Sequence, residues 1–124
     1  MYGYLTNIES DTLNNVYYRH VLYTTPNKHQ QLVIMSLQPE EEIGIEVHLK
    51  NTQFIRIESG EGVLQIEDEY FYIKEGSAFI IPSGTYHNVI NDSKDAPLKL
   101  YTIYTPANHP DGLLQKNKPL DEHD

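Results

Sequence analysis

The sequence has no cysteine among its 124 residues. Without cysteine the chain cannot form a disulfide, cannot use a thiolate as a nucleophile, and cannot hold zinc or an iron–sulfur cluster through sulfur. Any transition metal would have to be bound by histidine, by a carboxylate or by an amide oxygen. This absence narrows the chemistry that the chain can perform before any motif is considered.

Basic residues are also scarce, with 9 Lys and Arg against 18 Asp and Glu, which gives a formal net charge of −9. A general nucleic-acid binder needs a basic patch, and an anionic membrane surface attracts basic segments, so neither partner is expected. No apolar run approaches membrane-spanning length, and residues 1–15 lack the basic and apolar regions of a secretory signal. We therefore expect an intracellular, cytoplasmic protein.

Short stretches rich in β-branched and aromatic residues are abundant, and turn-forming residues separate them. Residues 1–15 are polar and are predicted to be irregular, and the chain from Pro106 onward is predicted to be an extended tail. Many short strands with no helical period predict an all-β barrel or sandwich in one domain. The predicted strands cover residues 16–23, 31–37, 43–49, 53–58, 63–66, 70–74, 77–81, 87–91 and 98–104.

One histidine follows a rigid corner in the stretch from Gly76 to Asn91. An apolar run leads to Pro82 and Gly84, which favour a tight turn because proline fixes φ and glycine accepts positive φ. His87 then begins the next strand, where its ring position would be well defined and would suit a metal ligand. An ordinary hairpin with a structural histidine is the alternative that this stretch alone leaves open.

A second cluster of polar residues lies on the alternating stretch 43–49 and at the start of the next strand. Glu46 and His48 are two residues apart, so their side chains share one face of a strand, and Gln53 follows. With His87 they would supply two imidazoles, a carboxylate and an amide oxygen, a set that suits divalent iron, manganese, nickel or zinc.

The same alternation also supports the opposite orientation. Ile45, Val47 and Leu49 occupy the other face, and the usual rule places apolar residues inside and Glu46 and His48 in water. In a barrel whose interior is a binding pocket the rule inverts. Periodicity does not decide between the two faces.

The two stretches together resemble the two sequence motifs of the cupins. The second motif, G-x5-P-x-G-x2-H-x3-N, is met at every defined position between Gly76 and Asn91. The first motif normally reads His-x-His, three or four residues, Glu, six residues and Gly. Here Glu46 replaces the first histidine and Gln53 replaces the glutamate, while His48, Gly60 and the spacing are retained.

Beyond these motifs the chain resembles small single-domain cupins of the mannose-6-phosphate-isomerase-like type. The resemblance implies a cupin-type double-stranded β-helix, or jelly-roll barrel, in one domain spanning 1–124, with a core at about 16–106 and a C-terminal tail at 107–124. It implies metal ligands at Glu46, His48, Gln53 and His87, and a homodimer. Related chains tend to carry a histidine in the tail, where this chain has Gln115. The matching runs are VLYT, QLVIMSL, EEIGIEVH, QFIRIESGEG, HNVIN, PLKLYTIYTP and HPDG.

The resemblance favours a metal-dependent isomerase or lyase that acts on a small sugar or sugar-acid-like substrate, because cupins that open or isomerise sugars and uronates also have glutamine at the third ligand position. A bound Zn, Mn, Fe or Ni ion would act as a Lewis acid. A non-haem iron dioxygenase and a non-catalytic small-molecule binder are the alternatives. Tyr101 and Tyr104 are the catalytic candidates, and only one of them can face inward; His20 and His109 are the other titratable candidates.

Overall fold

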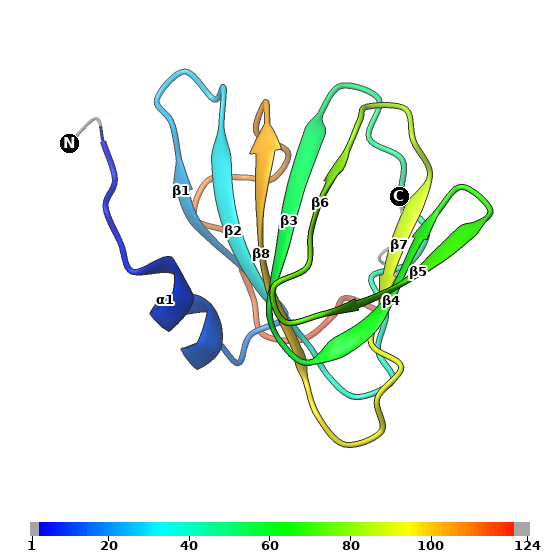
Figure 1. The fold of residues 1–124 in the computed structure, drawn as a ribbon. Helices are drawn as coiled ribbons and strands as arrows, with labels where there is room; N and C mark the ends of the chain where they lie inside the picture. The colour runs from blue at the N-terminus through cyan, green and yellow to red at the C-terminus, as the bar shows by residue number, and fades with distance from the viewer. Residues whose placement is uncertain (1–2, 121–124) are drawn as a thin grey trace.

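The computed structural model describes residues 3–120, and in this range it contains one short helix and nine strands (Figure 1). The predicted all-β class is therefore confirmed. The last four residues of the predicted tail lie outside the described residues. The elements are α1 (Ile8–Asn14), β1 (Arg19–Thr24), β2 (Gln31–Leu37), β3 (Thr52–Ser59), β4 (Glu61–Ile66), β5 (Glu69–Lys74), β6 (Ala78–Ile81), β7 (His87–Ile90), β8 (Leu98–Thr105) and β9 (Leu114–Gln115).

The strands form two antiparallel sheets that face each other across one core (Figure 1). The larger sheet has the order β6-β3-β8-β2-β1-β9, and the smaller has the order β5-β4-β7. Strand β8 of the larger sheet turns alternate residues inward and buries Leu98, Leu100, Thr102 and Tyr104. Two such sheets packed face to face make the predicted jelly-roll barrel.

The helix α1 was predicted as irregular chain, and that prediction is wrong. Asn7 caps the helix because its side-chain oxygen accepts a hydrogen bond from the Ser10 amide at 2.9 Å, and Glu9 and Asp11 lie in the first turn. The helix packs on the outside of the larger sheet, beside β2, β3 and β8. It spans only seven residues, too few for a periodic pattern to appear in the sequence.

The predicted strand at 43–49 is also wrong. Within this stretch only Glu46 forms a bridge, an isolated one with His87, and just before it Glu42 bridges Ile90. Gly44 interrupts it with a φ of 103°, and the Gly44 amide donates to the side-chain oxygen of Asn88 on β7 rather than to a backbone carbonyl. The stretch 43–49 is thus an irregular segment, and in 45–49 its contacts with β7 still turn alternate side chains to opposite sides.

The C-terminal stretch, predicted as an extended tail, returns to the barrel in its described part. β9 pairs with β1, and Gln115 accepts a hydrogen bond of 2.6 Å from the guanidinium of Arg19. Gln115, where the family resemblance leads us to expect a histidine, therefore has a structural contact here. The division into a core at 16–106 and a tail at 107–124 stays a prediction.

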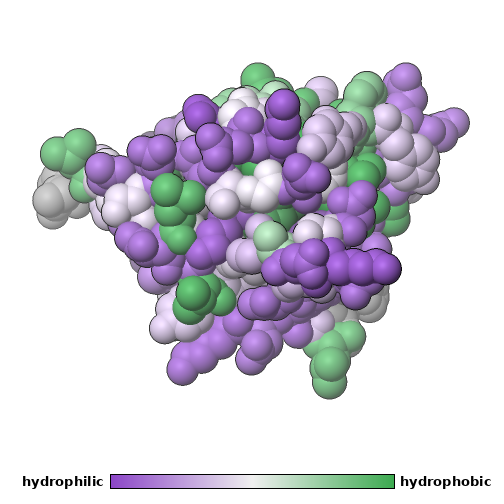
Figure 2. Space-filling model, turned by 60° about the horizontal axis from the view of Figure 1, so that its bottom comes forward, coloured by the Kyte–Doolittle hydropathy of each residue, from purple (hydrophilic) through white to green (hydrophobic). Residues whose placement is uncertain are grey.

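The lower end of the barrel is closed by polar connections. Buried Asn91, the last residue of the second motif, donates through Nδ2 to the carbonyls of Leu37, Gln38 and Ala96 at 2.9–3.1 Å. Figure 2 shows this end to be mostly hydrophilic, with separate hydrophobic residues. Among the described residues, no helix combines the length and apolar character needed to cross a bilayer.

Candidate metal centre

The backbone brings Glu46 and His87 face to face. The Glu46 amide donates to the His87 carbonyl at 2.8 Å, and the His87 amide donates to the Glu46 carbonyl at 2.9 Å. Residues paired in this way point their side chains to the same side of the sheet. His48, two residues after Glu46, shares that side, and its carbonyl accepts from the amide of Gly84, which has a φ of 82° at the predicted corner. The corner therefore positions both segments.

These three side chains form a compact and buried group. One potential ligand atom from each of Glu46, His48 and His87 lies within 4.8 Å of the others. Glu46 Oε1 is 3.4 Å from Nε2 of His48 and 3.7 Å from Nε2 of His87. The group has the charge, the atom types and the spacing that a metal ion would need.

In the stretch 45–49 the polar residues face the barrel interior and the apolar residues face outward, which is the reverse of the usual rule. Glu46 and His48 are only 3% and 8% exposed, whereas Ile45 and Leu49 are 42% and 78% exposed. The solvent-facing alternative for Glu46 and His48 is therefore wrong. Because the polar face lines the barrel interior, the apolar residues are left on the outside.

A backbone contact fixes the ring of His87. Its Nδ1 lies 2.9 Å from the carbonyl oxygen of Thr85. A carbonyl can only accept, so Nδ1 must carry the proton and donate it. Nε2 is then the ring nitrogen on the side of Glu46, and an Nδ1 that donates to a backbone carbonyl is typical of metal-ligating histidines.

Gln53 presents an amide oxygen to the barrel interior. Its side chain is buried on β3, and Nε2 donates to Oγ1 of Thr102 at 3.0 Å. Oε1 is buried and has no hydrogen-bond partner among the described residues. Buried polar atoms are nearly always satisfied, so this oxygen fits a missing metal or ligand. Sequence reasoning missed Thr102; the signal was its inward parity on the strand paired with β3.

Tyr101 and Tyr104 lie on opposite faces of β8, because they are three residues apart on one strand. Tyr104 is buried, and its ring lies edge-on to that of His48 with centroids 5.7 Å apart. Its hydroxyl is 3.4 Å from Nε2 of His109. Tyr101 is on the other face of β8, against Phe54. The structure thus brings Tyr104 and His109 toward the centre and leaves Tyr101 away from it.

His20 is not part of this group. It is half-buried on β1, and its ring contacts that of Tyr17 on the outer side of the barrel. It lines a hollow between α1 and the larger sheet rather than the barrel interior.

A hollow of about 430 Å³ opens beside the centre, and we name it the rim pocket. It shares His48 with the candidate metal group. Its lining residues are Val47, His48, Leu49, Lys50, Asn51, Asn108 and His109.

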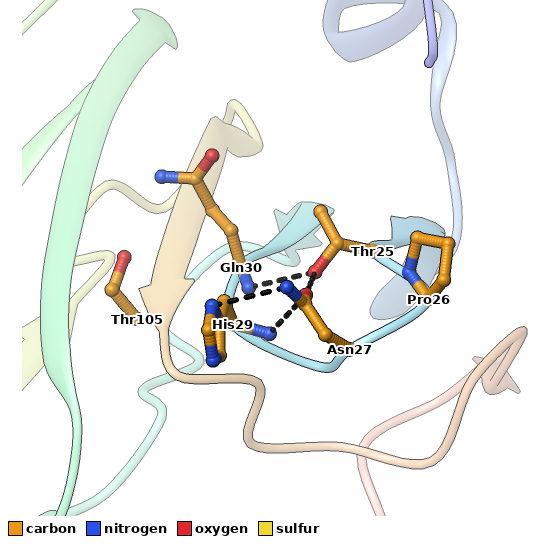
Figure 3. Close-up of a pocket in the computed structure, with 6 residues that line it drawn as sticks. All are labelled: Thr25, Pro26, Asn27, His29, Gln30 and Thr105. Carbon is orange, nitrogen blue, oxygen red and sulfur yellow. Dashed lines mark hydrogen bonds between the residues drawn. The ribbon is translucent and has the colours of Figure 1, made fainter. Parts of the chain in front are cut away.

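A second hollow, of about 490 Å³, lies under the loop that joins β1 to β2 (Figure 3). Gln30 and Thr105 line it, and each is next in sequence to a residue that points into the barrel (Gln31 and Tyr104), so they face the opposite side of the sheet. Asn27 bonds both Thr25 and His29, at 2.9 and 3.1 Å. Because its polar groups bond one another and it lies outside the barrel, this hollow is separate from the metal group.

Two curated proteins resemble the chain over almost all of its length. The uncharacterized protein L612 of Acanthamoeba polyphaga mimivirus is 46% identical over 119 residues, which cover 94% of this chain and 73% of the relative. The uncharacterized protein YrkC of Bacillus subtilis is 40% identical over 121 residues, which cover 93% of this chain. This chain spans only 63% of the length of YrkC.

Solved structures share the fold. The crystal structure of BH2720 from Bacillus halodurans is 39% identical with a TM-score of 0.87, and the match covers 93% of this chain and 89% of that one. A predicted oxalate decarboxylase from Thermotoga maritima is 25% identical with a TM-score of 0.60, over 64% and 69% of the two chains. The model of the cupin domain matches residues 33–104, which include every residue of the candidate metal group. The chain belongs to the cupin domain family.

Proposed function

We propose that the protein is a metal-dependent isomerase or lyase that acts on a small sugar or sugar-acid-like substrate, as its resemblance to the mannose-6-phosphate-isomerase-like cupins suggests. The observation that carries the proposal is the buried donor set: Glu46, His48 and His87 within 4.8 Å, with the unsatisfied Gln53 Oε1 also facing the interior. Zn, Mn, Fe and Ni all fit donors of this kind. A metal held there would supply Lewis-acid polarisation of a substrate carbonyl or hydroxyl.

The residues of the chain have distinct roles in this proposal. Glu46 supplies the negative charge that keeps the two imidazoles and a cation together. Gln53, oriented by Thr102, offers a neutral oxygen that binds either the cation or a substrate hydroxyl. The hydroxyl of Tyr104 and Nε2 of His109 form a polar pair next to the ring of His48, where they would bind a substrate oxygen or accept a proton. The relative described as a predicted oxalate decarboxylase supports the lyase class.

Metal content tests the proposal. We expect purified protein to carry one of the four metals in about stoichiometric amount by mass spectrometry, and we expect Glu46→Ala and His87→Ala each to lose it, because each removes a ligand of the set. His29→Ala, at an exposed histidine outside the barrel, is the matched control and should keep the metal. Wild-type protein that stays without metal after reconstitution would overturn the proposal.

A non-haem iron dioxygenase is the second candidate, because two histidines and one carboxylate are the donor set of many oxygen-activating iron sites. Oxygen consumption by the iron-loaded protein separates the two, since an isomerase or lyase consumes none. Tight substrate binding without turnover would favour a non-catalytic binding protein.

A further inference from the structure

We propose that the rim pocket is the substrate site and that it selects substrates carrying a carboxylate, which Lys50 and His109 recognise. The inference rests on the proposed function, because the pocket and the candidate metal group share His48. It narrows the substrate class from sugars and sugar acids to the acids.

The wall of the pocket that carries His109 is held in place by buried side chains. Gln31, 1% exposed, accepts from the amides of Asn108 and His109 at 3.1 and 2.9 Å and donates to the His109 carbonyl at 2.8 Å. Asn51 donates to the carbonyls of Pro106 and Ala107 at 2.5 and 3.2 Å. Five hydrogen bonds from two inward residues fix the segment 106–109 at the barrel mouth, so His109 stands at a defined position.

Charge distinguishes this pocket from the rest of the molecule. The chain carries twice as many acidic as basic residues, yet the lining holds Lys50, two histidines and two amides, and no carboxylate among the described residues. Glu46 lies 3.4 Å from His48 but is not among the lining residues, and in the proposed centre its charge would be matched by the metal. A cationic rim on an otherwise acidic surface attracts an anion, whereas a neutral sugar would gain nothing from it.

The depth of the site fits a small acid. The ring of Tyr104 contacts both His48, in the metal group, and His109, in the rim, with centroids 5.7 and 5.2 Å apart. A substrate of a few carbons would therefore span the distance from the metal group to the rim. Its carboxylate would meet Lys50 and His109 while its hydroxyl or carbonyl oxygens lie toward the metal group.

Binding of matched acid and neutral compounds tests the inference. The pairs are glycerate and glycerol, galacturonate and galactose, and gluconate and sorbitol, titrated calorimetrically into protein of measured metal content. We expect at least one acid to bind about tenfold more tightly than its neutral counterpart, the size of one charge-assisted hydrogen bond. Lys50→Met, at an exposed position, and His109→Phe should each remove most of this preference and leave the metal content unchanged.

Lys74→Met on β5 and His29→Phe in the loop between β1 and β2, both exposed and outside the lining of the pocket, are the matched controls and should keep the preference. If the protein carries metal but no acid binds better than its neutral counterpart, or if Lys50→Met keeps the preference, the inference is overturned and the proposed function stands. If the protein carries no metal but shows a preference that Lys50→Met removes, the pocket assignment is supported and the metal-dependent function is overturned.

Discussion

Gln53 shows how a single residue ties the fold to the chemistry. Its Nε2 is held by Thr102, which leaves Oε1 as the atom that faces the interior. In this orientation the amide nitrogen bonds the Thr102 hydroxyl, and the amide oxygen is left for another partner. A glutamine in this position therefore provides a neutral oxygen to the barrel interior, which also holds the buried carboxylate of Glu46.

We expect Gln53→Glu to strengthen metal binding and to weaken the metal-free protein. A second carboxylate binds a divalent cation more strongly than an amide does, but without the cation two buried carboxylates repel each other and are poorly solvated. Competition with a chelator should show metal affinity rising by about tenfold, and the melting temperature should fall without metal and recover with it. A recovery larger than the stabilisation of the wild type by the same metal would place the cation at residue 53.

Gln38→Glu, at an exposed position, is the control for this substitution and should change neither quantity. An unchanged metal affinity in Gln53→Glu would show that residue 53 is not a ligand and would assign its amide to the substrate instead.

The sequence predicts which residues belong to the site, because the motifs fix their spacing along the chain, but it does not predict their contacts in space. The second motif identified His87, and the first identified Glu46, His48 and Gln53, because a motif records positions along the chain. Which face they occupy was left open, since alternation gives the two faces and not which of them is inside. Thr102 was missed because its contact with Gln53 depends on the pairing of β3 with β8, 49 residues away.

At the scale of the elements, the packing of β4 against β7 depends on glycine. An added Cβ at Gly62 would lie 2.3 Å from the carbonyl oxygen of Ile90, a backbone atom that cannot move without shifting β7. β7 begins with His87, so the same contact also bears on the candidate centre.

We expect Gly62→Ala to lower the melting temperature by at least about 5 °C, because overpacking at a backbone contact costs on the order of 2 kcal/mol in a domain of this size. Gly3→Ala is the matched control, since nothing lies within 4 Å of its Cβ, and it should melt like the wild type. A melting temperature for Gly62→Ala equal to that of the control would show that the two strands can separate without penalty.

The two wrong predictions of secondary structure, the strand at 43–49 and the irregular chain where α1 lies, have the same physical cause. The stretch 43–49 has the period of a strand, but Gly44 takes a positive φ and the segment pairs at single residues rather than along a ladder. The helix α1 is stabilised by the cap at Asn7 and by packing on the larger sheet, not by a long amphipathic pattern. In both cases tertiary contacts outweigh the local pattern.

At the scale of the whole molecule, the barrel class follows from many short alternating segments, whereas the closure of the barrel mouth does not. The segment 106–109 looks like polar chain, and only the buried amides of Gln31 and Asn51 show that it is bound. Those amides have no periodic signal, because a buried glutamine satisfied by backbone groups looks in sequence like any exposed one. The rim pocket could therefore be found only from the structure.

The inverted alternation leaves an apolar strip outside the barrel, and we propose that a second copy of the chain covers it. Ile45 and Tyr86 are 42% and 54% exposed, and the pairing of Glu46 with His87 places their segments side by side. Leu49, 78% exposed, lies where this strip meets the edge of the rim pocket. Adjacent exposed apolar residues of this kind favour association. The homodimer expected from the family resemblance would bury them.

We expect light scattering after gel filtration to give the mass of a dimer for the wild type and of a monomer for Leu49→Glu, because a charge in the strip must lose its hydration when the strip is buried. Leu5→Glu, at a leucine that is 95% exposed elsewhere on the surface, should remain a dimer. A wild-type monomer at micromolar concentration would contradict the proposal. A dimer that persists in Leu49→Glu would move the contact to another face, of which the exposed Tyr70 and Tyr72 on β5 are the next candidates.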